Sequence, residues 1–283
     1  YISAYSYAEI IEPGGYLSSY FINFEGISIR NSFYAALILG LSLFPYVYLL
    51  TRIAIINFSA RFIEAAKTMG KGPFECFFKI CLPMALPGIT AGLALAIMET
   101  INDFGVSDFF GLQTLTIGVF QYISIINDLP AAFSLSLIII ILMGSLYIFE
   151  QRMRSEKKFH NSSYENLQWS RYKLSFGKAL FVFALCILPI LFGFLIPLFF
   201  TLYLFLISIE IINFSNYFIS LINSIILGSL VGFFCILISI FINFFYRFSQ
   251  NKGILYYKKL INVGYALPGV VIALGVLFFL KYL

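Results

Sequence analysis

A polar stretch at residues 59–83 holds the groups best placed for specific chemistry, and that chemistry is recognition through charge. It carries four cations around Glu64: Arg61, Lys67, Lys71 and Lys79. Apolar runs too long for an ordinary hydrophobic core flank it on both sides. The plainest interpretation is a solvated basic loop at a membrane surface. The alternative is a shaped element that docks on a partner.

The same stretch predicts two short helices joined by a tight turn. Ser59 has the side chain of a helix N-cap, and Gly70 suits a left-handed residue that ends a helix. Pro73 is favoured in a first helical turn, and we expect the second helix to stop before Pro83. Two such helices would present a compact knob at the membrane surface.

Two acids, Glu99 and Asp103, lie four residues apart at the end of an apolar run. That spacing places both on one face of a helix, near its outer end. Acids at such a depth are costly, and by default they mark a transport pathway, a charged partner or a water-filled cavity. The alternative is that both reach the outer interface, where burial is mild. The sequence leaves both interpretations open.

No catalytic or metal-binding constellation is visible. The chain has a single histidine, His160, and lacks the zinc, nucleophile-elbow and phosphate-loop motifs of common enzymes. We expect the four cysteines to act as small apolar filler. They are Cys76, Cys81, Cys186 and Cys235. We therefore predict no enzyme activity, no catalytic residue, no metal and no cofactor held by this chain.

Composition places these groups in an integral membrane protein. Of 283 residues, 61% are hydrophobic and 11% are charged, whereas soluble domains are about a quarter charged. Several windows reach the roughly 20 apolar residues that a spanning helix needs. We therefore predict an all-α, polytopic transmembrane helical bundle. The expected complete spans are 32–50, 84–102, 131–149, 179–206 and 218–245, with partial spans at 1–11 and near the end of the chain.

The cations predict the orientation of these spans. If residues 57–83 face the cytoplasm, all but two of the eighteen Lys and Arg lie on that side, the exceptions being Arg30 and Lys281. Acids concentrate on the other side. The net charge of +5 thus indicates membrane orientation, and we expect lipid contacts and no nucleic-acid partner.

The polar stretch also carries a spacing that resembles the EAA loop of binding-protein-dependent ABC importer permeases. Glu64-Ala65-Ala66 is followed after three residues by Gly70, and nine residues separate that glycine from Ile80. In this family the loop is the cytoplasmic element that docks on the ATPase. The resemblance implies a coupling loop at 57–83 whose main residues are Glu64, Ala65, Ala66, Gly70, Ile80, Leu82 and Pro83.

Further motifs resemble the ferric-iron branch of that family. They are FPYVYLL at 44–50, METINDFG at 98–105, Phe110 with Thr114 and Thr116, GFLIP at 193–197, and YALPG at 265–269. The resemblance covers nearly the whole chain. Thiamine, phosphonate, sulfate and polyamine permeases are close relatives of this branch, so they stay alternatives for the substrate.

The resemblance also implies how the chain is divided. We expect residues 1–150 to form the latter part of a first permease half, 151–177 a charged cytoplasmic linker, and 178–283 the start of a second half. The chain would then be a fragment of two fused halves, with a second coupling loop outside it. Unrelated spans with no internal repeat are the alternative.

The function implied is that of a permease subunit in a bacterial inner membrane, most consistent with import of ferric iron. A cytoplasmic ATPase dimer would bind ATP, and a periplasmic binding protein would deliver the substrate. Glu99 and Asp103 would lie on the pathway. The alternative of another class is a secondary transporter or channel that needs no ATPase, and a membrane-embedded scaffold or enzyme is a third.

Overall fold

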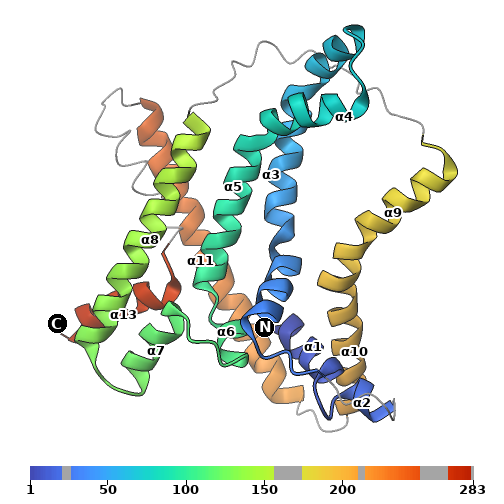
Figure 1. The fold of residues 1–283 in the computed structure, drawn as a ribbon. Coiled ribbons are helices and arrows are strands. Elements are labelled where there is room, and N and C mark those ends of the chain that lie inside the picture. Colours follow the sequence, from blue (N-terminus) through green and yellow to red (C-terminus); the bar gives the residue numbers. More distant parts are fainter. Residues whose placement is uncertain (21–26, 156–173, 210–213, 249–266, 282–283) are drawn as a thin grey trace. The chain divides into compact units, whose positions relative to one another are not determined.

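A computed structural model describes residues 1–20, 27–155, 174–209, 214–248 and 267–281, and in these ranges the fold is helical with no strand (Figure 1). The all-α prediction is confirmed. Chain contacts divide the protein into two units, residues 1–199 with 266–283, and residues 200–265. Most of the predicted linker, residues 156–173, lies outside the described ranges.

The first unit begins with short helices and continues into long ones. In chain order it contains α1 (Ile2–Ile11), α2 (Tyr16–Tyr20), α3 (Ser32–Thr68), α4 (Pro73–Cys76), the π turn η1 (Phe77–Cys81), α5 (Leu82–Asn102), α6 (Gly105–Phe109), α7 (Leu115–Ser124), α8 (Leu129–Ser155), α9 (Phe176–Ile190), the π turn η2 (Leu191–Leu195), the first residues of α10 (Ile196–Ser208), and α13 (Gly269–Lys281). The second unit contains the rest of α10 and α11 (Phe214–Phe248).

Five helical segments in the described ranges are long and apolar enough to cross a membrane, as the sequence predicts. They are Ser32–Ile56, Pro73–Asn102, Leu129–Met153, Phe176–Ser208 and Phe214–Phe245. A spanning helix hides every backbone N–H and C=O within itself, which is why such apolar runs become helices in lipid. The protein is thus a multi-pass membrane protein with the predicted spans.

The first span continues well beyond its apolar part. Helix α3 runs unbroken for 37 residues, about 55 Å at 1.5 Å per residue, and only Ser32–Ile56 has the composition of a span. The prediction that Ser59 caps a new helix is therefore wrong, because Ser59 lies inside α3. No glycine or proline stands between the span and Ser59, so extending the existing helix avoids the cost of a new nucleus.

Helices α3 and α5 make the most extensive helix contact among the described residues of the first unit, and two glycines make that contact possible. A Cβ placed on Gly88 would lie 2.6 Å from the Leu50 carbonyl oxygen, and one on Gly92 would lie 2.5 Å from the Val47 Cα. Neither position has room for a side chain. Gly88 and Gly92 thus allow the two helices to approach closely.

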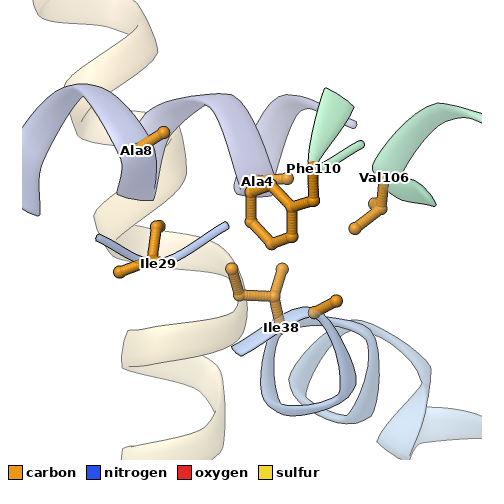
Figure 2. Close-up of a cluster of buried hydrophobic side chains, with 7 residues drawn as sticks. Ala4, Ala8, Ile29, Ile38, Val106 and Phe110 are labelled. Atoms are coloured by element: carbon orange, nitrogen blue, oxygen red, sulfur yellow. The ribbon is translucent and has the colours of Figure 1, made fainter. Parts of the chain in front are cut away.

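A cluster of buried side chains joins α1, α3 and α6 at the end of the bundle opposite the α3–α4 connection (Figures 1 and 2). Figure 2 shows Phe110 and Ile38 pointing into the same space below α1, with Ile29 alongside. Arg30 closes the cluster through an ion pair to Glu12, 2.9 Å from Nε to Oε1, which raises the pKa of its guanidinium. These contacts connect the segment before α3 to α1 and α6.

A second cluster joins α5, α7, α8 and α13 around Met98, Val119, Ile139, Met143 and Val271. The segment between α5 and α8 forms the two short helices α6 and α7, and α7 packs along α8. Helix α13 reaches this cluster from the far end of the sequence. The cluster thus links α5 and α8 to α7 and α13.

Candidate functional site

The turn after α3 has the geometry that its glycine predicts. Gly70 has φ +78°, the left-handed region that glycine adopts without strain. The Lys71 N–H donates to the Ala66 carbonyl at 3.0 Å, across five residues, and so satisfies an orphan carbonyl in the manner of a Schellman motif. The prediction that Gly70 ends this helix in a left-handed conformation is confirmed.

The helix that follows begins as predicted and ends elsewhere. Pro73 occupies the first turn of α4 after an extended Gly72. The expected stop before Pro83 is wrong, because the chain stays helical from α4 through η1 and α5 to Asn102. The π turn η1 allows the helix to continue through Pro83. Its wider hydrogen-bond ladder relieves the clash between the proline ring and the carbonyl four residues earlier. Figure 1 shows α4 lying across the direction of α5, with the bend between them.

The inner face of this hairpin, residues 64–81, consists of small side chains. Ala66 is 0% exposed and Cys76 is also buried, and both α4 and η1 pack against α3. The Cys76 thiol lies 3.8 Å from the Lys71 carbonyl oxygen, as a weak donor. Ala66 therefore serves the contact within the hairpin and presents no side chain to a partner.

The outer face combines the predicted residues with an apolar group that we did not predict. Glu64, Ala65 and Gly70 are exposed. Beside them in the sequence, Met69 is 70% and Phe74 is 79% exposed, and Phe77 and Phe78 are exposed as well. Large apolar side chains within a polar connection between spans were the available signal. Such exposed rings are typical anchors of protein interfaces.

Charges on the hairpin are paired along one line. Glu75 accepts from Lys79 Nζ at 2.8 Å and lies 3.6 Å from Lys71 Nζ, at four-residue spacing in both directions. Exposed pairs of this kind contribute little stability, on the order of a few tenths of a kcal/mol. They orient the side chains of α4 and η1 and leave one surplus positive charge in the trio.

The last residues of the predicted coupling loop lie where η1 passes into α5. Ile80 and Leu82 are half-buried, while Pro83 is exposed. Ile80 and Leu82 are thus placed to fix the hairpin on its span, and the exposed tip belongs to residues 69–74. The predicted coupling loop thus has an exposed tip and a half-buried end that joins α5.

The two predicted pathway acids do not share a helix face. Helix α5 ends at Asn102, so Asp103 lies past its end in extended backbone. Its Oδ2 accepts the N–H groups of Val106 and Ser107 at 3.0 and 3.1 Å. Asp103 therefore acts as the cap of α6, because a carboxylate satisfies the orphan N–H groups of a first turn. Glu99 remains on α5, half-buried, one turn before the helix ends.

The two threonines of the expected iron-permease motif also have structural roles. The Thr114 hydroxyl accepts the Ile117 N–H at the start of α7, at 3.4 Å. Thr116 is fully buried, and its hydroxyl donates to the Ile101 carbonyl at 2.6 Å, which joins α7 to α5. The described residues contain no cluster of three or more His, Cys, Asp or Glu side chains of the kind that holds a metal ion.

Sequence comparison relates this hairpin and its helices to a known family. Residues 17–155 match the family described as binding-protein-dependent transport system inner membrane component. The matched segment contains the whole hairpin together with α3, α5, α7 and α8.

Individual relatives are transport permeases with two different cargoes. A molybdenum transport system permease protein of Haemophilus influenzae is 30% identical over 116 residues, covering 38% of this chain and 51% of the relative. A spermidine/putrescine transport system permease protein of Salmonella typhimurium is 28% identical over 159 residues, covering 53% and 55%. A spermidine/putrescine permease of H. influenzae is 37% identical over 78 residues, covering 27% of each.

The chain spans about half the length of the relatives it matches, or less. No solved structure is significantly similar to it.

Proposed function

We propose that this chain is the membrane permease subunit of an ATP-driven ABC importer and that residues 64–79 dock on its ATPase. The observation that carries the proposal is that the hairpin is joined to the first span by one continuous helix. Helix α3 leads from the span to Thr68 without interruption, and its last twelve residues extend about 18 Å beyond the apolar part. A partner that moves the hairpin would therefore move the span.

The proposed mechanism is alternating access driven by a lever. When ATP closes the partner dimer, the hairpin follows, and α3 carries the motion into the bilayer. Gly88 and Gly92 hold α5 directly on the backbone of α3, so the two spans would move as one body. The chain supplies no ATP site in this scheme, and all nucleotide chemistry belongs to the partner.

The proposal is supported by the family match over 17–155 and by the exposed apolar tip of the hairpin. The rival of another class is a secondary transporter, whose uptake would continue without ATP. We place the protein in a bacterial inner membrane, with the hairpin in the cytoplasm and a periplasmic binding protein on the far side.

The test is isolation of the full permease from membranes with its ATPase. Ala65→Glu puts a charge on the exposed face of the hairpin, and we expect it to release the ATPase and abolish ATP-dependent uptake at normal permease levels. Ile125→Glu, at the exposed end of α7, is the matched control and should retain both. Uptake that persists without ATP in the parent protein would overturn the proposal.

For the substrate we propose ferric iron held by the binding protein, on the motifs at 98–105 and 110–116. Two relatives that carry molybdenum or polyamines make these the competing cargoes. The experiment is uptake of radiolabelled Fe(III), molybdate and putrescine by cells that carry the complete transporter, each with the other two as competitors. Saturable uptake of molybdate or putrescine, unaffected by iron, would replace ferric iron as the substrate.

A further inference from the structure

Two π turns occupy the same position relative to a proline. Turn η1 ends at Cys81, and Pro83 stands two residues later; turn η2 ends at Leu195, and Pro197 stands two residues later. Both turns pack against α3. The heptapeptides FFKICLP and LFGFLIP thus adopt the same local structure in two places in the chain.

The hydrogen bonds explain what each proline does. The Leu82 N–H donates five residues back to the Phe77 carbonyl, and the Ile196 N–H donates likewise to the Leu191 carbonyl. In an α-helix those amides would bond the carbonyls of Phe78 and Phe192. The next amide of the wide ladder would be residue 83 or 197, and proline has no N–H. The Phe78 and Phe192 carbonyls are therefore both displaced from the regular ladder.

At η2 the displaced carbonyl has found another donor, since the Tyr7 hydroxyl of α1 donates to the Phe192 oxygen. Gly193 also lies directly against α3, where a Cβ would be 2.4 Å from the Leu41 oxygen. At η1 no side chain of the described residues donates to Phe78. Both turns thus pack on α3, and they differ in that the Tyr7 side chain also holds the displaced carbonyl of η2, whereas no described side chain holds that of η1.

We propose that Pro83 is the positioning residue of the hairpin: it keeps η1 wide and so sets the rotation of α4 relative to α5. A π turn holds one residue more than the α-helical turn it replaces, and one residue corresponds to about 100° of helix rotation. Phe74 and Met69 would face another direction if η1 closed. The inference rests on the proposed function only for its consequence, the loss of docking, and not for the geometry.

The test uses Pro83→Ala, which restores the missing N–H. Spin labels at Phe74 and Leu93, both exposed, report the hairpin against α5 by pulsed electron resonance in the reconstituted permease, with the native cysteines replaced. Closure of η1 rotates α4 by about 100°, which moves a label at a radius of about 5 Å by roughly 8 Å. An unchanged distance would overturn the inference.

Two further variants separate positioning from mere stability. Deleting Phe78 in the Pro83→Ala protein removes the surplus residue and should return the parent distance, whereas Phe78→Ala alone should leave that distance unchanged. Pro197→Ala is the matched control, because η2 lies away from the hairpin, and it should keep ATPase binding. A changed distance with unchanged ATPase binding would contradict docking at this face and with it the proposed function.

Discussion

At Gly70 a single backbone angle decides where α3 ends and where the hairpin points. A residue with a Cβ adopts the φ of +78° at a cost of about 1–2 kcal/mol. A Cβ at this position would meet nothing within 4 Å, so the backbone angle and not a lack of space explains the glycine. The requirement was visible in the sequence because a glycine follows a charged segment that we predicted to be helical. This part of the site follows from local chemistry alone.

We predict that Gly70→Ala reduces ATPase binding and uptake several-fold, because the strained turn displaces α4. Gly70→Asn should retain more of both, since asparagine tolerates the left-handed region. Gly72→Ala is the control: its φ is −70° and nothing lies within 4 Å of its Cβ position. Co-purification of the ATPase measures the effect, and equal behaviour of the two alanine variants would contradict the argument.

The acids of residues 98–105 show where the sequence argument failed. The four-residue spacing of Glu99 and Asp103 predicts one face only if the helix continues, and α5 ends between them. The apolar pattern does not mark that end. The helix ends there because Asp103 accepts the N–H groups of Val106 and Ser107, which lie further along the chain. The two acids therefore call for separate tests.

We predict that Asp103→Ala lowers the free energy of unfolding of the permease by about 1 kcal/mol, the usual cost of a lost helix cap. Glu99→Gln should leave stability near that of the parent and reduce uptake, if Glu99 lies on the pathway. Thermal unfolding in detergent and uptake in vesicles measure the two effects. Full uptake by stable Glu99→Gln protein would remove Glu99 from the pathway.

At the scale of elements, the spans were predictable and their ends were not. A run of about 20 apolar residues has one stable form in lipid, so the five spans followed from composition. Helix ends depend on finer competition: α3 continued past Ser59, and a π turn carried the chain past Pro83. Residue preferences at caps and prolines are worth a few kcal/mol at most, and packing against neighbours outweighs them.

The α3–α5 contact gives the prediction that belongs to this scale. Gly92→Val places methyl groups where the Val47 backbone already lies. We therefore expect the free energy of unfolding to fall by roughly 1–3 kcal/mol. We also expect the two spans to lose their coupled motion. Gly144→Val on α8 is the control, because nothing lies within 4 Å of its Cβ position. Thermal unfolding of both variants decides the matter, and equal stability would mean that α3 and α5 do not need close contact.

At the scale of the whole molecule, the proposed importer combines the long helix α3, the exposed end of the hairpin and an uneven distribution of charge. The family match and the hairpin support the class of transporter, whereas the substrate has no counterpart in the described residues, which contain no cluster of metal ligands. A permease whose binding protein selects the cargo needs no such cluster. The ferric-iron proposal therefore rests on the motifs at 98–105 and 110–116 and not on metal ligands among the described residues.

Orientation is the property on which the whole scheme depends. The cations predict the hairpin in the cytoplasm, so a cysteine at Met69 should react with a membrane-impermeant maleimide only in inside-out vesicles, and one at Ile125 only in right-side-out vesicles. Both positions are exposed, while native Cys76 and Cys81 are buried. The parent protein measures background labelling. If Met69→Cys reacted from the outer side, the hairpin would lie where no ATP is available, and a transporter driven by an ion gradient would explain the fold better.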